Sequence, residues 1–163
     1  MRSRALDKIG TEDLVKLYID ADACPVKAEV ERVATRHGLE MCVVSNGGIR
    51  PSPNPLVQTV VVDASADAAD KWIADQCTQK DVVITNDIPL AARAIENGAI
   101  VVKPNGEVIS AKNIGSILAS RNLMADLRAS DPFFISKGRP FSKSDRSNFL
   151  NALERVIVTS LKN

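Results

Sequence analysis

Short runs of β-branched and aliphatic residues alternate along this chain with segments of helical spacing, and no other feature constrains the fold as much. Most of the runs are apolar on successive positions, which is typical of strands buried on both faces of a parallel sheet. Five runs fit this description, at residues 14–19, 40–45, 57–62, 81–85 and 99–103. Three segments between them have helical spacing, at residues 25–38, 65–77 and 88–98. We therefore predict a three-layer α/β/α domain with a mainly parallel five-stranded sheet in the middle.

Proline, glycine and serine mark the ends of the predicted elements. Pro25 is tolerated in the first turn of a helix, and Gly38 is typical of the residue that follows one. Ser65 is predicted to cap the helix over 65–77. The segment "NGGIRPSPNP", residues 46–55, holds too much glycine and proline for regular structure, so one crossover is expected without a full helix.

The pattern changes after residue 104. A short edge strand is expected within 104–110, a helix over 110–128, an irregular segment over 130–141 and a last helix over 142–161. Ser142, with Asp145 three residues later, predicts a reciprocal cap at the start of that last helix. We expect residues 1–13 to form a flexible N-terminal extension and residues 14–163 a single domain, on which 110–163 packs as a C-terminal helical segment.

The composition excludes several classes of protein. The chain of 163 residues is long enough for one domain with its own core. A net charge of +1 gives no global field toward nucleic acid or membrane, and no apolar run has the length of a membrane span. Aromatic residues make up 4%, so a stacking platform for bases is not expected. Three widely spaced cysteines fit a reducing cytoplasm better than a disulfide framework or a zinc site.

Aspartates gather where the predicted strands end. Asp20 and Asp22 close the first strand, Asp67 and Asp70 open the helix after the third, and Asp87 follows the fourth. Ligands of parallel α/β sheets bind beyond the carboxyl ends of the strands. If the first and fourth strands are neighbours, these acids converge, and their mutual repulsion is relieved by a cation. Oxygen ligands without histidine select Mg²⁺ or Mn²⁺, which points to phosphoryl transfer or phosphodiester hydrolysis.

Each of these residues also has a simpler interpretation. Asp22 and Asp87 precede helices and fit the role of N-caps as well as that of ligands. Cys24 precedes a helix N-terminus, but its acidic neighbours favour a buried packing residue over a reactive thiol. His37, the one histidine of the sequence, is expected to be exposed near a helix end and is given no role.

Four stretches, "DADACPV", "SADAADKWI", "TNDIPLAARAIENGA" and "GRPFSKSDRSNFL", resemble the signatures of the YaiI/YqxD family of bacterial proteins, over about residues 17 to 154. Members of this family resemble PIN and NYN nuclease-like domains, which hold Mg²⁺ or Mn²⁺ with a ring of aspartates. The resemblance implies a PIN-like domain with Asp20, Asp67 and Asp87 as catalytic, metal-holding acids, and with Asp22 and Asp70 as accessory metal ligands. It implies a magnesium- or manganese-dependent nuclease that acts on RNA or another nucleic acid.

Basic residues near the two irregular segments are candidates for binding a phosphate chain. They are Arg50, Lys137, Arg139, Lys143 and Arg146. A solvated surface turn is the alternative interpretation of this basic segment. Two other functions stay open: a haloacid-dehalogenase-like phosphatase with Asp20 as nucleophile, and a non-catalytic nucleic-acid-binding or regulatory protein. A homodimer is likewise left open.

Overall fold

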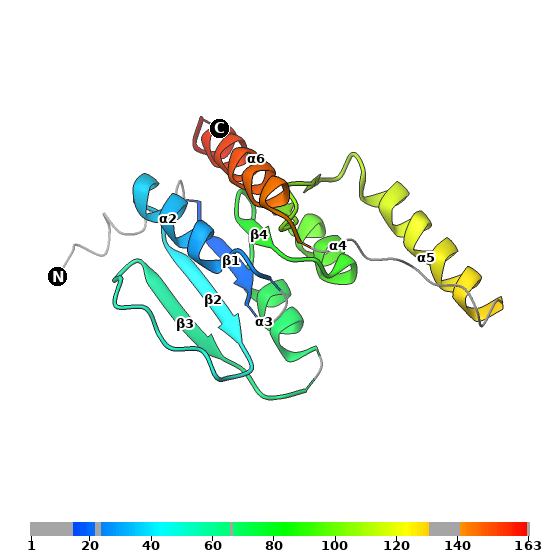
Figure 1. Cartoon of the computed structure of the whole chain (residues 1–163), viewed down its shortest axis with the longest axis horizontal. Helices are drawn as coiled ribbons and strands as arrows, with labels where there is room; N and C mark the ends of the chain where they lie inside the picture. Colours follow the sequence, from blue (N-terminus) through cyan, green and yellow to red (C-terminus); the bar gives the residue numbers. More distant parts are fainter. Residues whose placement is uncertain (1–14, 22–23, 66, 131–140, 163) are drawn as a thin grey trace.

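The computed structural model describes residues 15–21, 24–65, 67–130 and 141–162 (Figure 1). The extension predicted over 1–13 and most of the irregular segment predicted over 130–141 lie outside these residues.

Six strands form one sheet in the order β3-β2-β1-β4-β5-β6. The first five are parallel, and β6 pairs antiparallel with β5. The predicted count of five was therefore one too low, because the short edge strand expected within 104–110 turns back and pairs with its neighbour. The bounds are Leu17–Asp20 for β1, Met41–Ser45 for β2, Val57–Val61 for β3, Val82–Ile84 for β4, Ile100–Val102 for β5 and Val108–Ile109 for β6.

Five helices accompany the sheet in the described part of the chain. They are α2 (Lys27–His37), α3 (Ala68–Gln76), α4 (Ile88–Glu96), α5 (Ile114–Ser130) and α6 (Lys143–Lys162). Gly38 ends α2 in the left-handed conformation, with φ of 70°, as predicted. The predicted reciprocal cap of α6 is confirmed: the Ser142 N–H donates to Asp145 Oδ2 at 3.0 Å, and the Asp145 N–H donates to Ser142 Oγ at 3.1 Å.

The prediction for Ser65 was wrong. Helix α3 begins at Ala68 with Asp67 as its N-cap residue, and the Ser65 hydroxyl donates to Asp63 Oδ1 at 2.5 Å instead. The Asp63 carboxylate also accepts from the Ser65 N–H at 2.9 Å, which makes a local turn. This turn competes with the cap for the same side chain and delays the start of the helix.

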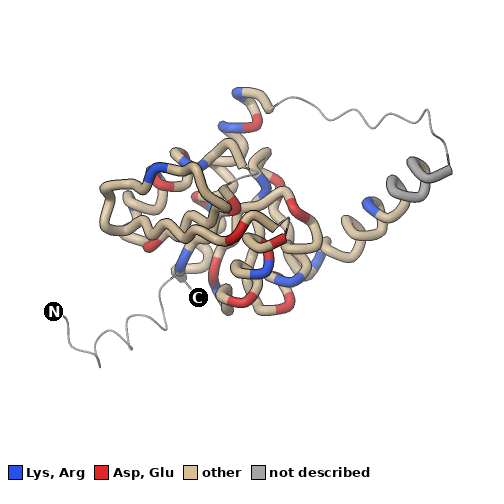
Figure 2. The backbone as a smooth tube through the Cα atoms, turned by 90° about the horizontal axis from the view of Figure 1, so that it is seen from below, with Lys and Arg blue, Asp and Glu red and all other residues tan. Residues whose placement is uncertain are grey.

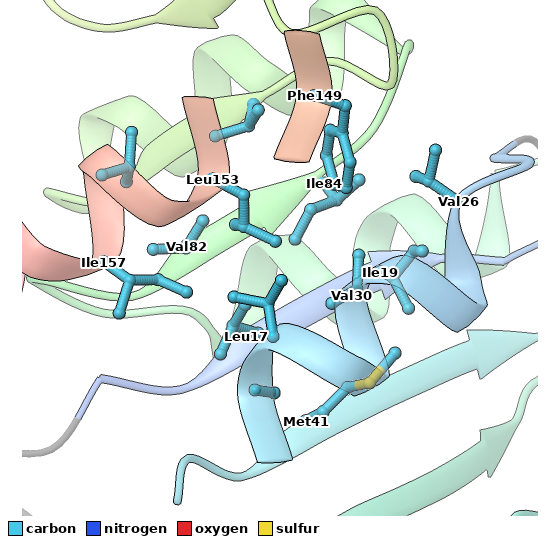
Figure 3. Close-up of a cluster of buried hydrophobic side chains, with 14 of the residues drawn as sticks. Leu17, Ile19, Val26, Val30, Met41, Val82, Ile84, Phe149, Leu153 and Ile157 are labelled. Carbon is cyan, nitrogen blue, oxygen red and sulfur yellow. The ribbon is translucent and has the colours of Figure 1, made fainter. Parts of the chain in front are cut away.

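The helices cover both faces of the sheet and make three layers. Alternate residues of β1 point to opposite faces, so Leu17 and Ile19 join the cluster under α2 and α6, while Tyr18 joins the cluster under α3 and α4. Figure 3 shows side chains from α2, α6 and the sheet meeting in the first cluster, where Phe149 is fully buried. Each fully buried large side chain of this kind contributes roughly 1.5–3 kcal/mol of transfer free energy.

A carboxylate on α6 ties this helix to the end of α2. Glu154 accepts hydrogen bonds from Arg36 and contacts Nε2 of His37 at 3.0 Å. The expectation of an exposed His37 was therefore wrong: its side chain is 19% exposed and is bound to another helix. A partner 117 residues away gives no local signal in the sequence.

Helix α5 extends away from the rest of the molecule (Figure 1), and its first turns, at Ile114 and Ile117, pack on the α3–α4 cluster. No helix of the described residues is long and apolar enough to span a bilayer. Acidic and basic residues are interspersed along the tube of Figure 2.

The turn between β5 and β6 packs tightly on α6 at one glycine. Gly106 has φ of +95°, and a Cβ there would lie 2.6 Å from the Asn148 carbonyl carbon. We predict that Gly106→Ala lowers the free energy of unfolding by about 2–4 kcal/mol, since it combines backbone strain with overpacking. Gly115→Ala is the matched control, because its Cβ would meet nothing within 4 Å; it should be neutral or slightly stabilising. Urea denaturation checks both, and equal losses would contradict the contact.

Candidate acidic site at the carboxyl edge of the sheet

Strands β1 and β4 are neighbours, with Ile19 opposite Ile84, as the convergence of the acids required. Asp20, the last residue of β1, therefore lies next to the start of the segment that leads from β4 into α4. Asp20 is 6% exposed, which is unusual for a carboxylate and means that its surroundings must compensate for lost hydration.

Asp87 is held in place by the backbone around it. Its Oδ1 accepts a hydrogen bond from the Leu90 N–H at 2.8 Å, and its own N–H donates to Thr85 Oγ1 at 3.0 Å. The capping interpretation of Asp87 is thus confirmed. One oxygen of the carboxylate suffices for the cap, so the second remains available to the neighbouring acids.

Asp70, in the first turn of α3, connects the acids to one another. Burial, a side-chain hydrogen bond with Asp87, and then the charges of Asp87, Asp20 and Asp67 raise the pKa of Asp70 to about 7. Burial is the largest cause, and each further cause is an acid, from β1, α3 or the start of α4. Asp70, which we predicted as an accessory ligand, therefore interacts with each of the other acids Asp20, Asp67 and Asp87.

Asp67 lies at the outer side of this cluster. It is the N-cap residue of α3 but makes no side-chain capping hydrogen bond, and its carboxylate pairs with Lys71 Nζ at 3.4 Å. Its side chain is 59% exposed. Asp67 is therefore the acid of this cluster that is most accessible to an incoming ligand.

We call Asp20, Asp67, Asp70 and Asp87 the acidic cluster. All its donors are carboxylate oxygens, which is the chemistry that hard cations such as Mg²⁺ and Mn²⁺ take. Within the described ranges, no three acids, histidines or cysteines stand at metal-ligand spacing. The donor set fits such a cation, and the carboxylates must move closer together to surround one.

Cys24 is placed behind the cluster as a packing residue. Its thiol donates to the Ile84 carbonyl oxygen at 3.7 Å, and it belongs to the core under α2 and α6. Burial and the nearby Asp20 charge raise its pKa to about 12, which keeps the thiol protonated and unreactive.

The predicted phosphate-binding cations differ in their surroundings. Arg50 and Lys143 are exposed. Arg146 is bound to Glu29 of α2, and its guanidinium lies 5.0 Å from the centre of the Phe141 ring. Asp22, Lys137 and Arg139 lie outside the described residues.

Glu29 was missed in the sequence. It is 7% exposed, and no hydrogen-bond partner of its Oε1 lies among the described residues, while its Oε2 accepts from the Arg146 guanidinium. The available signal was its position beside Val26, Val30 and Val33, on the face of α2 that is otherwise apolar. A charged residue at such a position requires a partner from another element.

Comparison with known proteins shows the family to which this chain is similar. The family described as "Uncharacterized BCR, YaiI/YqxD family" matches residues 18–159. A UPF0178 protein of Cereibacter sphaeroides is 64% identical over 144 residues, which cover 88% of this chain and 89% of the relative. UPF0178 proteins of Roseobacter denitrificans (62% identical; 88% of this chain, 95% of the relative) and Gluconacetobacter diazotrophicus (48%; 91% and 96%) are further relatives. No solved structure matches the chain.

The raised pKa of Asp70 has a consequence for stability. A carboxyl whose folded pKa of about 7 exceeds its ordinary 3.8 binds its proton more tightly in the folded state, so its contribution to stability is lost as pH rises from about 4 to 7. We predict that Asp70→Asn, measured in EDTA, becomes progressively more stable than the wild type between pH 5 and 8. Thermal melts at four pH values check this. Asp75→Asn, an exposed acid on the same helix, is the control, and identical pH profiles for all three proteins would contradict the cluster.

Proposed function

The chain belongs to the YaiI/YqxD family, and we propose that it is a divalent-metal-dependent phosphodiesterase that acts on RNA or another nucleic acid. The observation that supports this most directly is the position of Asp70, whose carboxyl group is hydrogen-bonded to one acid and lies in the field of two more. Acids gathered from three segments at the carboxyl edge of a parallel sheet destabilise the fold unless a proton or a cation intervenes.

Asp20, Asp70 and Asp87 would hold Mg²⁺ or Mn²⁺, with Asp67 at the open side. A bound cation of this kind lowers the pKa of water and balances charge on a phosphate. The chain's own contribution is rigidity. The Leu90 N–H fixes the carboxylate of Asp87, and Asp20 is held at the end of a strand paired on both sides. Such preorganisation is what a hydrolytic site needs from its protein.

The surroundings of the acidic cluster suit a polymeric phosphate. Helix α6 begins at this edge, since Arg146 in its first turn binds Glu29 in the first turn of α2, and Figure 3 shows Phe149, in its second turn, beside Ile84. The exposed Lys143 and the half-buried Arg146 belong to its first turn. Arg50 lies in the loop between β2 and β3, where Gly47 and Gly48 have positive φ and a Cβ would meet nothing within 4 Å. We infer that the exposed Lys143 and Arg50 contact phosphates of the polymer, whereas Arg146 stays bound to Glu29.

Cleavage of labelled single-stranded RNA in Mn²⁺ tests the activity. We predict that Asp20→Asn lowers the cleavage rate by more than about 100-fold, because the inner carboxylate is lost. Asp75→Asn should cleave as the wild type does. Equal cleavage by the Asp20→Asn variant and the wild type would identify a contaminant. Tight RNA retention without turnover by the wild type, unaffected by Asp20→Asn, would indicate a non-catalytic binder.

Asp87 allows the roles of cap and ligand to be separated. Asparagine is as good an N-cap as aspartate, so Asp87→Asn keeps the hydrogen bond from Leu90 and should not destabilise the fold. The variant loses the charge, and we predict that its affinity for Mn²⁺ falls at least about tenfold. Calorimetric titration and urea denaturation of the same samples check the two effects. No Mn²⁺ binding by the wild type at millimolar concentration would overturn the shared site.

A further inference from the structure

A cavity lies at the amino edge of the central strands, opposite the edge that carries the acidic cluster. Its volume is about 330 Å³, and it is bounded by the start of β1, the loop before β2 and the loop between α3 and β4. The lining includes Lys16, Tyr18, Leu39, Glu40, Gln76 and Gln79. None of the acids of the acidic cluster lines it, so the cavity requires an explanation of its own.

One wall of this cavity is rigidly built around Asp81. This buried carboxylate accepts from the Lys16 N–H at 3.2 Å, from the Thr78 N–H at 2.9 Å and from the Thr78 hydroxyl at 3.1 Å. The three bonds join the start of β1 to the loop before β4. The wall is therefore formed before any ligand arrives, as is usual for small-molecule sites.

Lys16 supplies a cation that the described residues leave without an ion pair. Its backbone N–H donates to Asp81, while its Nζ lies 5.6 Å from the centre of the Tyr18 ring. The side chain is half-buried, and none of the ion pairs of the described residues involves it. The Lys16 charge acts on the Asp81 carboxylate from beyond ion-pair distance, so the ammonium remains able to bind an anionic group in the cavity.

The rest of the lining suits a flat ring with polar edges. Gln76 and Gln79 each carry an amide that both donates and accepts, and Glu40 carries an acceptor at the rim. Val15 and Leu39 add apolar surface. Volumes of roughly 300 Å³ and above are those of pockets that enclose small organic ligands. The volume exceeds what a free phosphate ion needs.

We propose that this cavity binds a nucleoside monophosphate. The phosphate binds the Lys16 ammonium, and the exocyclic amino group of adenine, cytosine or guanine donates to Glu40. Uracil lacks this amino group and binds more weakly. The site lies at the other edge of the sheet from the acidic cluster and needs neither a metal nor phosphodiesterase activity.

Titration of the ¹⁵N-labelled chain with AMP, CMP, GMP and UMP in EDTA tests the proposal, with the amide signals of Thr78 and Gln79 as the readout. AMP, CMP and GMP should shift these signals at millimolar concentration, and UMP should bind more weakly. Adenosine and inorganic phosphate, given alone, should each bind more weakly than AMP. The Asp20→Asn variant should bind AMP as the wild type does, which separates this site from the proposed nuclease site.

Lys16→Gln should weaken AMP binding about tenfold or more through loss of one charge-assisted contact, while Lys16→Arg retains binding. Glu40→Gln should reduce the difference between CMP and UMP. Lys112→Gln, at an exposed lysine remote from the lining, is the control. The proposal is overturned if AMP leaves the Thr78 and Gln79 signals unmoved, if Lys16→Gln folds and binds as tightly as the wild type, or if Lys16→Arg folds but fails to bind.

Discussion

The parallel pairing of β1 between β2 and β4 is the interaction on which the rest of this structure depends. The four residues of β1 are all buried, and its alternating side chains join both hydrophobic clusters. A strand placed so centrally fixes the positions of whatever precedes and follows it. Lys16 precedes β1 and Asp20 is its last residue. This one short strand therefore fixes the positions of residues at both edges of the sheet.

This scaffold allows the carboxyl edge to hold groups that oppose folding. The acidic cluster brings together like charges whose repulsion adds to burial in raising the pKa of Asp70. The packing of α3 and α4 on the face that carries Tyr18 supplies the apolar burial that outweighs this repulsion. Functional sites commonly concentrate such locally unfavourable arrangements on an otherwise consistent framework.

Much of this arrangement could be predicted from the sequence, because the signals were local or followed from topology. Apolar runs indicated the strands. The pairing of β1 with β4 brings Asp20 and Asp87 to one edge of the sheet. The start of α3 could not be predicted, since Asp63 and Ser65 formed a turn that competes with the expected cap. The bonds of Glu154 to His37 and of Glu29 to Arg146 join residues far apart in the sequence, and no pattern within one segment indicates them.

A comparison of Asp81 with Asp70 separates a structural aspartate from a functional candidate. The pKa of each is raised, and burial is the largest cause in both. Backbone and hydroxyl donors from Thr78 and Lys16 oppose the shift at Asp81, so its charge is satisfied by the fold. The further contributions at Asp70 come from other acids and all add to the shift. A carboxylate bound by N–H donors needs nothing more, whereas one surrounded by carboxylates needs a proton or a cation, and this difference in partners makes the carboxyl edge the place where chemistry is expected.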